Sequence, residues 1–228
     1  MCGRYTRHYT WEQIHAQYEA FIKHTSNLQP RANICPTTQV DTIVVEEGRR
    51  TFEPMRWGLI PSWFRPDKKK KQYATFNARA ETVDTLPTFR SAFKRNRCII
   101  PASGYYEWQT IEGDKPQPWY FTSTQGPIIS IAGIWDEWKN PETGELVRSC
   151  SMIITEPNRF VAEVHDRMPV ILRPEQFDAW LSVEAGKEML VPAAEDALQK
   201  WPVSKRVNSS RAPDDDLSLM EPISLEAA

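Results

Sequence analysis

The chain has 228 residues, of which 40% are hydrophobic and 25% charged, and its formal net charge at pH 7 is −2. This composition, which includes nine tryptophans, supplies apolar side chains for a sizeable core and excludes a mainly disordered chain. The charge balance argues against a surface coated with nucleic acid, although local basic patches can still bind it. Length alone allows one large domain or two small ones.

The cysteines lie at positions 2, 35, 98 and 150 without a C-x-x-C pair, and the four histidines are scattered. Because no metal-ligand spacing is present, we expect no structural metal and no cofactor. The N-terminus lacks an apolar signal core, and no stretch approaches the ~18 apolar residues of a membrane span. We therefore expect a cytoplasmic protein with reduced cysteines, associated with the nucleoid in a bacterium or nuclear in a eukaryote. We also expect a monomer.

The sequence begins Met1-Cys2-Gly3-Arg4, and the small residue at position 2 permits removal of Met1. Cys2 would then carry both a free α-amine, which titrates near ~7.7–8.0, and a thiol, which titrates near ~8.5. Such a 1,2-aminothiol forms an imine with an aldehyde and then closes through sulfur to a five-membered thiazolidine. Most cysteines at position 2 are ordinary small residues, so this feature alone is a weak signal.

The first predicted element is a helix over residues 10–22. Thr10 and Gln13 have the spacing of a capping box, and apolar residues from Ile14 to Ile22 recur at helical spacing. Residues 42–46 and 51–57 then form two β-rich runs around a turn at 47–50, which predicts a hairpin.

Further β-rich runs, separated by Gly and Pro, occupy residues 98–100, 104–109, 119–122, 128–132 and 151–154. Residues 84–96 and 174–190 are predicted to be helical. Because the strands cluster in the middle of the chain, the order favours an α+β fold with a largely antiparallel, barrel-like mixed β-sheet flanked by helices. We expect a single domain over residues 1–210 and a flexible acidic tail over 211–228, which contains Asp214 to Asp216.

Two basic clusters stand out against the acidic net charge. Lys68 to Lys71 follow the aromatic pair Trp63-Phe64. Four cations, at positions 90, 94, 95 and 97, lie within eight residues on and directly after the predicted helix 84–96. Either cluster is consistent with a phosphate contact or with a solvated surface.

Six short segments together carry a resemblance to a known family. They are Met1-Cys2-Gly3-Arg4-Tyr5, Arg31-Ala32-Asn33-Ile34-Cys35-Pro36, Trp57-Gly58-Leu59-Ile60-Pro61-Ser62-Trp63, Asn77-Ala78-Arg79-Ala80-Glu81, Gly104-Tyr105-Tyr106-Glu107-Trp108 and Val164-His165-Asp166-Arg167-Met168-Pro169. In this order the chain resembles the SRAP family, named for SOS response-associated peptidase and understood as a shield of abasic sites in single-stranded DNA.

The resemblance implies a covalent DNA-protein cross-link during the response to DNA damage. The Cys2 amine would attack the aldehyde of a ring-opened abasic sugar in single-stranded DNA, and the thiol would close a thiazolidine. The ring removes the electrophilic iminium that drives β-elimination, so it would protect the strand from cleavage. The resemblance implies an enzyme of the lyase type that also has an autopeptidase activity.

Three other catalytic positions are implied by the resemblance. Glu107 lies between two aromatic residues on a predicted strand, where one-sided burial would raise its pKa and suit it to relay protons. His165, with an ordinary pKa near ~6.5, can protonate the sugar ring oxygen. Asn77 can hold a sugar hydroxyl or the reacting terminus. Without the resemblance, an exposed strand carboxylate, a core histidine and a turn asparagine would explain the same residues.

The implied DNA-binding residues are Arg4, Pro36, Trp63, Phe64, Arg79, Trp108 and Arg167. The three arginines are candidate phosphate ligands because guanidinium groups make forked hydrogen bonds to phosphate. The aromatic pair at 63 and 64 is a candidate wedge that stacks on bases beside the lesion. Cys35 stands where the family pattern has a small apolar residue, which predicts a second thiol near the site.

Two other functions remain open from the sequence. Cys2 could be the N-terminal nucleophile of a peptidase, activated by Glu107 and His165, with self-removal of Met1 as its minimal activity. Alternatively, the protein could read modified or single-stranded nucleic acid without forming a bond. A cross-linker retains DNA in denaturant and a reader releases it, whereas a peptidase should process a peptide regardless of any aldehyde.

Overall fold

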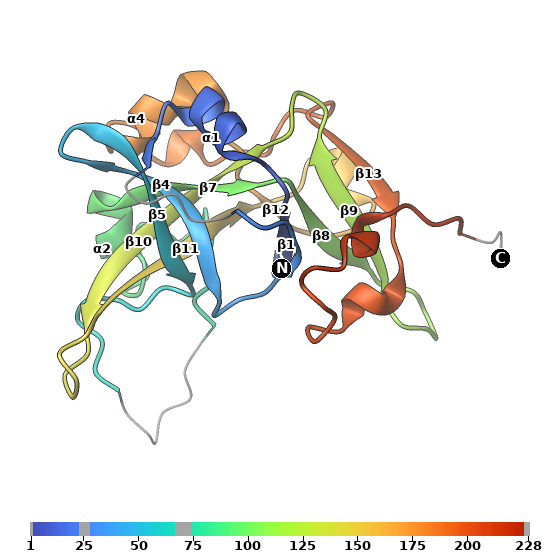
Figure 1. Cartoon of the computed structure of the whole chain (residues 1–228), viewed down its shortest axis with the longest axis horizontal. Coiled ribbons are helices and arrows are strands. Elements are labelled where there is room, and N and C mark those ends of the chain that lie inside the picture. Colours follow the sequence, from blue (N-terminus) through green and yellow to red (C-terminus); the bar gives the residue numbers. More distant parts are fainter. Residues whose placement is uncertain (1, 23–27, 67–73, 226–228) are drawn as a thin grey trace.

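The structure, a computed structural model, describes residues 2–22, 28–66 and 74–225 (Figure 1). Met1 and the predicted basic run Lys68 to Lys71 lie outside the described residues. The strands are β1 Tyr5–Arg7, β2 Phe21–Ile22, β3 Arg31–Ile34, β4 Gln39–Glu46, β5 Arg49–Trp57, β6 Asn77–Arg79, β7 Arg97–Ala102, β8 Gly104–Gln109, β9 Gln117–Ser123, β10 Ile129–Lys139, β11 Leu146–Thr155, β12 Met168–Pro169 and β13 Leu198–Pro202. The helices are α1 Trp11–Tyr18, α2 Arg90–Arg95, α3 Arg159–Ala162 and α4 Phe177–Leu181, with 3₁₀ turns at η1 Pro174–Gln176, η2 Lys187–Met189, η3 Lys205–Asn208 and η4 Leu217–Met220.

Five strands close into a barrel. The order β11-β10-β7-β4-β5 is antiparallel throughout, and a parallel pairing of β11 with β5 joins the two ends of the series. The β4–β5 hairpin turns at Glu47 and Gly48, whose φ values of 51° and 76° suit a tight two-residue loop. The α+β class and the barrel-like mixed sheet predicted from sequence are confirmed.

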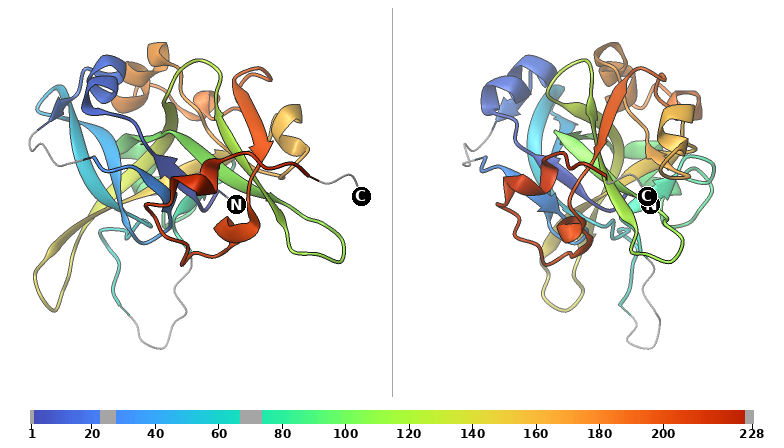
Figure 2. Two further views of the ribbon diagram at one scale, coloured as in Figure 1. Left: turned by 45° about the vertical axis from the view of Figure 1, so that its right-hand side comes forward. Right: turned by 90° about the vertical axis from the view of Figure 1, so that its right-hand side faces the viewer.

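A second sheet lies beside the barrel, with strand order β13-β9-β8-β1-β3 (Figures 1 and 2). One buried cluster joins this sheet to the barrel strands and includes Tyr5, Tyr105, Phe121 and Trp57. A separate buried cluster contains residues of α1, α2 and α4 packed on barrel strands. None of the helices in the described ranges has the length and hydropathy to cross a bilayer.

The predicted helices are longer than the observed ones. The capping box at Thr10 and Gln13 is present, but Glu19 adopts a left-handed φ of 50° and ends α1 after Tyr18. Phe21 and Ile22 then pair with β5 as β2 instead of extending the helix. Only 90–95 of the predicted helix 84–96, and 177–181 of 174–190, are α-helical. The predicted strands are all present, each within an observed strand or overlapping one.

Residues 211–225 pack on the domain, which differs from the flexible acidic tail expected from their composition. Asp214 forms an ion pair with Arg31 and accepts a hydrogen bond of 2.9 Å from the Asn33 N–H. Leu219 is fully buried, and the Trp201 indole N–H donates to the Met220 carbonyl at 2.8 Å. A few apolar residues spaced among Ser, Pro and Asp thus anchor the segment, whose path Figure 2 shows in red.

Candidate functional site

Cys2 is positioned by two strand pairings. The antiparallel pairing of β1 with β8 aligns Tyr5 with Tyr105, and the Tyr106 N–H donates to the Arg4 carbonyl at 3.0 Å. The chain before β1 therefore runs beside the second half of β8, which carries Glu107. From the other side, β6 pairs in parallel with β11, and Asn77 Nδ2 donates to the Cys2 carbonyl at 2.9 Å. The Cys2 residue is only 2% exposed.

Glu107 is a buried carboxyl group beside this cysteine. It is 1% exposed, and burial raises its pKa to about 7, while a hydrogen bond with the Cys2 side chain acts in the opposite direction. The direction agrees with the expectation for a carboxylate between aromatic residues. Burial also raises the pKa of the Cys2 thiol well above its ordinary value, and the charge of Glu107 raises it further. At neutral pH the thiol is therefore protonated, next to a carboxylate that can accept its proton.

His165 completes the cluster from a separate part of the chain. Asn158 caps α3 through a 2.9 Å bond to the Val161 N–H, and the His165 N–H donates to the Val161 carbonyl at 3.0 Å. The imidazole Nε2 lies 3.6 Å from Glu107 Oε2. Nδ1 accepts a hydrogen bond of 3.0 Å from the Arg167 N–H and also lies 3.1 Å from Asp166 Oδ1. In the neutral tautomer that accepts from Arg167, the ring proton is on Nε2, which faces Glu107.

Burial lowers the pKa of His165 and favours this neutral form. The structure thus brings together the four residues expected to be catalytic, Cys2, Asn77, Glu107 and His165, from distant segments of the chain. Among the residues that the structure describes, no group of three or more His, Cys, Asp or Glu could hold a metal ion.

The two aromatic residues expected to form a wedge have different environments. Trp63 is 53% exposed on the turn that follows β5. The Phe64 ring instead packs against Trp138 with ring centroids 6.2 Å apart, and its carbonyl accepts a 2.9 Å hydrogen bond from the Trp138 indole. Trp63 alone of this pair therefore presents an open aromatic face.

The three arginines expected to bind phosphate also differ. Arg79 is exposed on β6, two residues from Asn77, and within the described ranges it forms no ion pair. Arg167 forms an ion pair with Glu81. Arg4 is held within the fold, since its Nη1 donates to Asn33 Oδ1 at 2.5 Å and to the carbonyl of residue 207 at 2.9 Å.

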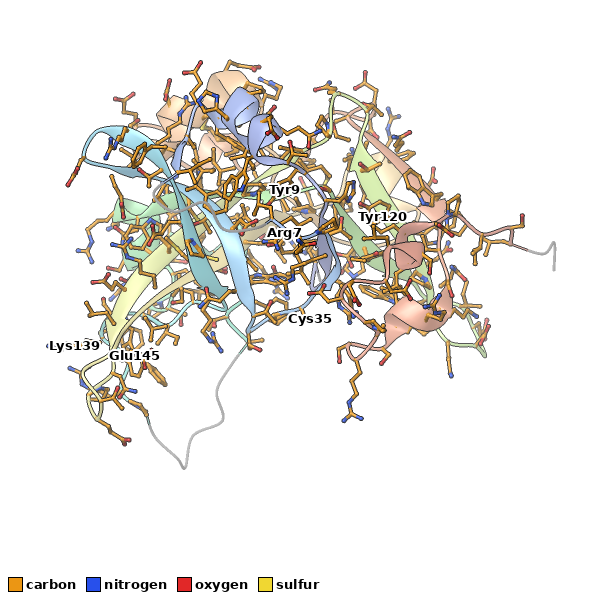
Figure 3. The ribbon with its side chains drawn as sticks, viewed as in Figure 1. Arg7, Tyr9, Cys35, Tyr120, Lys139 and Glu145 are labelled. Carbon is orange, nitrogen blue, oxygen red and sulfur yellow. The ribbon has the colours of Figure 1, made fainter. Side chains whose placement is uncertain are left out.

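Trp108 packs against this arginine, and Pro36 lies in the turn after β3. The Arg4 guanidinium lies over the Trp108 ring at 5.5 Å, and the indole N–H donates to Asn208 Oδ1 at 2.7 Å. Pro36 is half-buried in the turn after β3. The neighbouring Cys35 is half-buried too, and burial raises its thiol pKa. Figure 3 shows Cys35 beyond the end of β3, away from Arg7 and Tyr9.

Tyr105 belongs to the same site, because after burial the charges of Cys2 and Glu107 act on its hydroxyl and raise its pKa. The sequence predicts no role for it beyond membership of a motif. Residues i and i+2 of a strand point to the same face, so Tyr105 and Glu107 of β8 share a face. That alternation is the signal that could have identified it.

The buried Glu107 makes stability depend on pH. Because its folded-state pKa of about 7 exceeds the reference value of 4.5, the folded state binds more protons between these values, and stability is lost as pH rises through this window. Glu107→Gln removes the titration, so relative to wild type the variant gains up to about 3 kcal/mol between pH ~4.5 and pH ~8. Urea unfolding of both proteins at the two pH values measures this gain. If the free energies of unfolding of variant and wild type differed by the same amount at both pH values, Glu107 would not be a buried ionisable group.

Comparison with known proteins gives a consistent result. A family model described as SOS response associated peptidase (SRAP) matches residues 1–210. The abasic site processing protein YoaM of Bacillus subtilis is 33% identical over 219 residues, which cover 92% of this chain and 94% of that protein. The abasic site processing protein HMCES of Xenopus tropicalis is 34% identical over 191 residues, which cover 73% of this chain and 56% of that protein.

Solved structures show the same fold. A crystal structure of a protein from Bacteroides thetaiotaomicron superposes with a TM-score of 0.85 at 25% identity, covering 98% of this chain and 100% of that one. One from Bordetella bronchiseptica superposes with a TM-score of 0.77 at 29% identity, covering 89% and 100%.

Proposed function

The chain belongs to the SRAP family, and we propose that it processes abasic sites by binding single-stranded DNA and linking Cys2 covalently to the ring-opened sugar. The observation that carries this proposal is the surroundings of Cys2. The thiol is buried against a carboxyl group whose pKa is about 7, and Asn77 holds the Cys2 backbone. These groups suit a reaction in which one residue supplies two nucleophiles and a neighbour moves protons.

The reaction follows from these groups once Met1 has been removed. The Cys2 amine adds to the sugar aldehyde, and the adduct takes up one proton from solvent and loses one water, which gives a protonated imine. The thiol proton passes to Glu107, the sulfur bonds to the imine carbon, and the C=N electron pair returns to nitrogen. Ring opening comes before this: His165 takes up a proton from solvent and passes it to the sugar ring oxygen, while the C1 hydroxyl releases its proton to solvent and becomes the aldehyde. The neutral thiazolidine has no iminium to drive β-elimination, so the strand stays intact.

The DNA interface in this proposal surrounds the same residues. Arg79 contacts phosphate directly, and Arg167 exchanges its ion pair with Glu81 for a phosphate. Trp63 stacks on a base beside the lesion, a contact worth roughly 1–3 kcal/mol, while Phe64 supports the turn that carries it. Arg4, Pro36 and Trp108 form the opposite wall. We propose that the protein acts as a monomer, in the compartment that holds the DNA.

A denaturing gel tests the proposal. Met1-processed protein is mixed with single-stranded DNA that carries one abasic site, and a heat-stable shifted band is expected. The matched control is the same strand with a tetrahydrofuran analogue, which has no aldehyde and should give no band. Retardation of abasic DNA in a native gel without any denaturant-stable band would instead indicate a non-covalent reader.

A peptidase is the weaker alternative. Cysteine nucleophiles of hydrolases are activated by a lowered thiol pKa, whereas burial and Glu107 raise that of Cys2. A protonated imine held next to the thiol is a stronger electrophile than an amide, so cross-linking tolerates this environment better. One self-removal of Met1 is compatible with the same residues.

A further inference from the structure

The hydroxyl group of Tyr105 is a buried polar group that the reaction above does not use. The residue is 1% exposed, and its ring stacks on Phe121 with centroids 5.0 Å apart and an interplanar angle of 9°. The Oη atom is buried and forms no hydrogen bond in the part of the chain that the structure describes. Since a buried hydroxyl without a partner is destabilising, such a group calls for a functional explanation.

The position of Tyr105 supplies that explanation. It shares a face of β8 with Glu107, and the chain that leads from β1 back to Cys2 runs beside the half of β8 that carries Glu107. Both neighbours lie close enough for their charges to act on the hydroxyl, because after burial the charges of Cys2 and Glu107 are the causes that raise its pKa. The hydroxyl therefore stays protonated and remains a donor throughout the reaction.

The stack on Phe121 also fixes where this donor lies. Phe121 is opposite Tyr105 in the β8–β9 register and packs edge-on against Phe160 of α3. The rings of Tyr105, Phe121 and Phe160 thus connect β8 through β9 to α3, the helix that precedes His165. The Tyr105 ring is thus held by packing, and its hydroxyl is preorganised near the reacting cysteine.

We propose that Tyr105 is a further catalytic residue whose hydroxyl donates a hydrogen bond to the Cys2 sulfur as that atom loses its proton. The inference rests on the proposed cross-linking function. In ring closure the thiol proton goes to Glu107, the sulfur carries developing negative charge until the S–C bond forms, and the tyrosine keeps its own proton. The donor stabilises that charge, as preorganised donors do at other developing anions.

The test compares Tyr105→Phe with Tyr106→Phe. Tyr106 is the neighbouring tyrosine on β8 and is also fully buried, but its hydroxyl donates to the Ala32 carbonyl at 2.9 Å on the other face. The control thus removes a buried hydroxyl from the same strand without touching the site. Circular dichroism melting of both variants checks that they fold.

The first readout needs no DNA. Because Tyr105→Phe keeps the ring that packs around the 2%-exposed Cys2, the ratio of variant to wild-type rates of Cys2 alkylation by iodoacetamide at pH 8, read by peptide mass spectrometry, reports the change in thiolate fraction and not a change in access. Loss of a donor to sulfur should slow alkylation in Tyr105→Phe by roughly tenfold or more, with wild-type rates in Tyr106→Phe. If the hydroxyl instead donates to Glu107, its loss in Tyr105→Phe would raise the pKa of that carboxyl. Glu107 would then carry less negative charge beside the thiol, and alkylation of Cys2 would be unchanged or faster. Such a result would overturn the proposal.

The second readout is the single-turnover rate of cross-linking to abasic single-stranded DNA. Tyr105→Phe should be slower by about tenfold or more, with unchanged non-covalent affinity, and Tyr106→Phe should match wild type. A wild-type rate in Tyr105→Phe would overturn the role of Tyr105 and leave the proposed function intact. If wild type itself forms no cross-link, the proposed function fails, and alkylation still decides whether the hydroxyl acts on the sulfur.

Discussion

Replacing Cys2 by serine or alanine is expected to reduce the cross-link with abasic DNA to the background seen with unmodified DNA. Both residues are small enough to keep Met1 removal, and both keep the α-amine. Without sulfur, however, the reaction stops at an imine that water reverses, because a serine hydroxyl is a much poorer nucleophile. A denaturing gel with single-turnover sampling measures the loss, and native gels should show that DNA binding is retained.

The matched control for this experiment is Cys35→Ser. Cys35 is half-buried and its thiol donates to the Asn33 carbonyl at 3.4 Å, so it has no place in the reaction. Its variant should cross-link at the wild-type rate. A heat-stable adduct formed by Cys2→Ser would contradict the proposed chemistry, whichever of the remaining cysteines formed it.

Glu107→Gln is expected to slow cross-linking by roughly 10²–10⁴-fold, the usual contribution of a positioned acid or base. Glutamine fills the same space but cannot accept the thiol proton. Because the pKa of Glu107 is about 7, the wild-type rate should rise as pH increases through that value and the carboxyl loses its proton. The variant should lack the inflection near pH 7 and keep only the later rise that comes from the α-amine, which titrates near ~7.7–8.0.

Single-turnover rates measured at a series of pH values, together with the non-covalent dissociation constant, test this expectation. Glu163→Gln provides the control, because Glu163 is an exposed residue whose carboxylate pairs with Lys200. It should retain both the rate and the pH dependence. If Glu107→Gln kept the inflection near neutral pH, another group would be the proton acceptor.

The fold was predictable from sequence where local pattern decides it. Alternating β-rich runs bounded by Gly and Pro identified the long barrel strands, and the capping box located the start of α1. The helix ends were not predictable. Phe21 and Ile22, for example, continue the apolar spacing of α1 but pair with β5 as a strand. Short strands such as β1 and β6 carry almost no local signal, since long-range pairing defines them.

The site depended on similarity rather than on local pattern. The cysteine, amide, carboxyl and imidazole groups lie far apart in the chain, and only the β1–β8 and β6–β11 pairings bring them together. Two neighbouring aromatic residues could not be told apart by sequence either. Trp63 is open, whereas Phe64 packs on Trp138, a residue more than seventy positions away. The hydrogen bond from Arg4 to the carbonyl of residue 207 was not predictable for the same reason.

The most direct test of the central claim is the intact mass of the wild-type adduct, measured before and after treatment with borohydride. A thiazolidine at Cys2 predicts the mass of Met1-processed protein plus DNA minus one water, unchanged by the reductant. An adduct that gains two hydrogens on reduction would be an open imine, and an adduct on any other residue would contradict the assignment of Cys2.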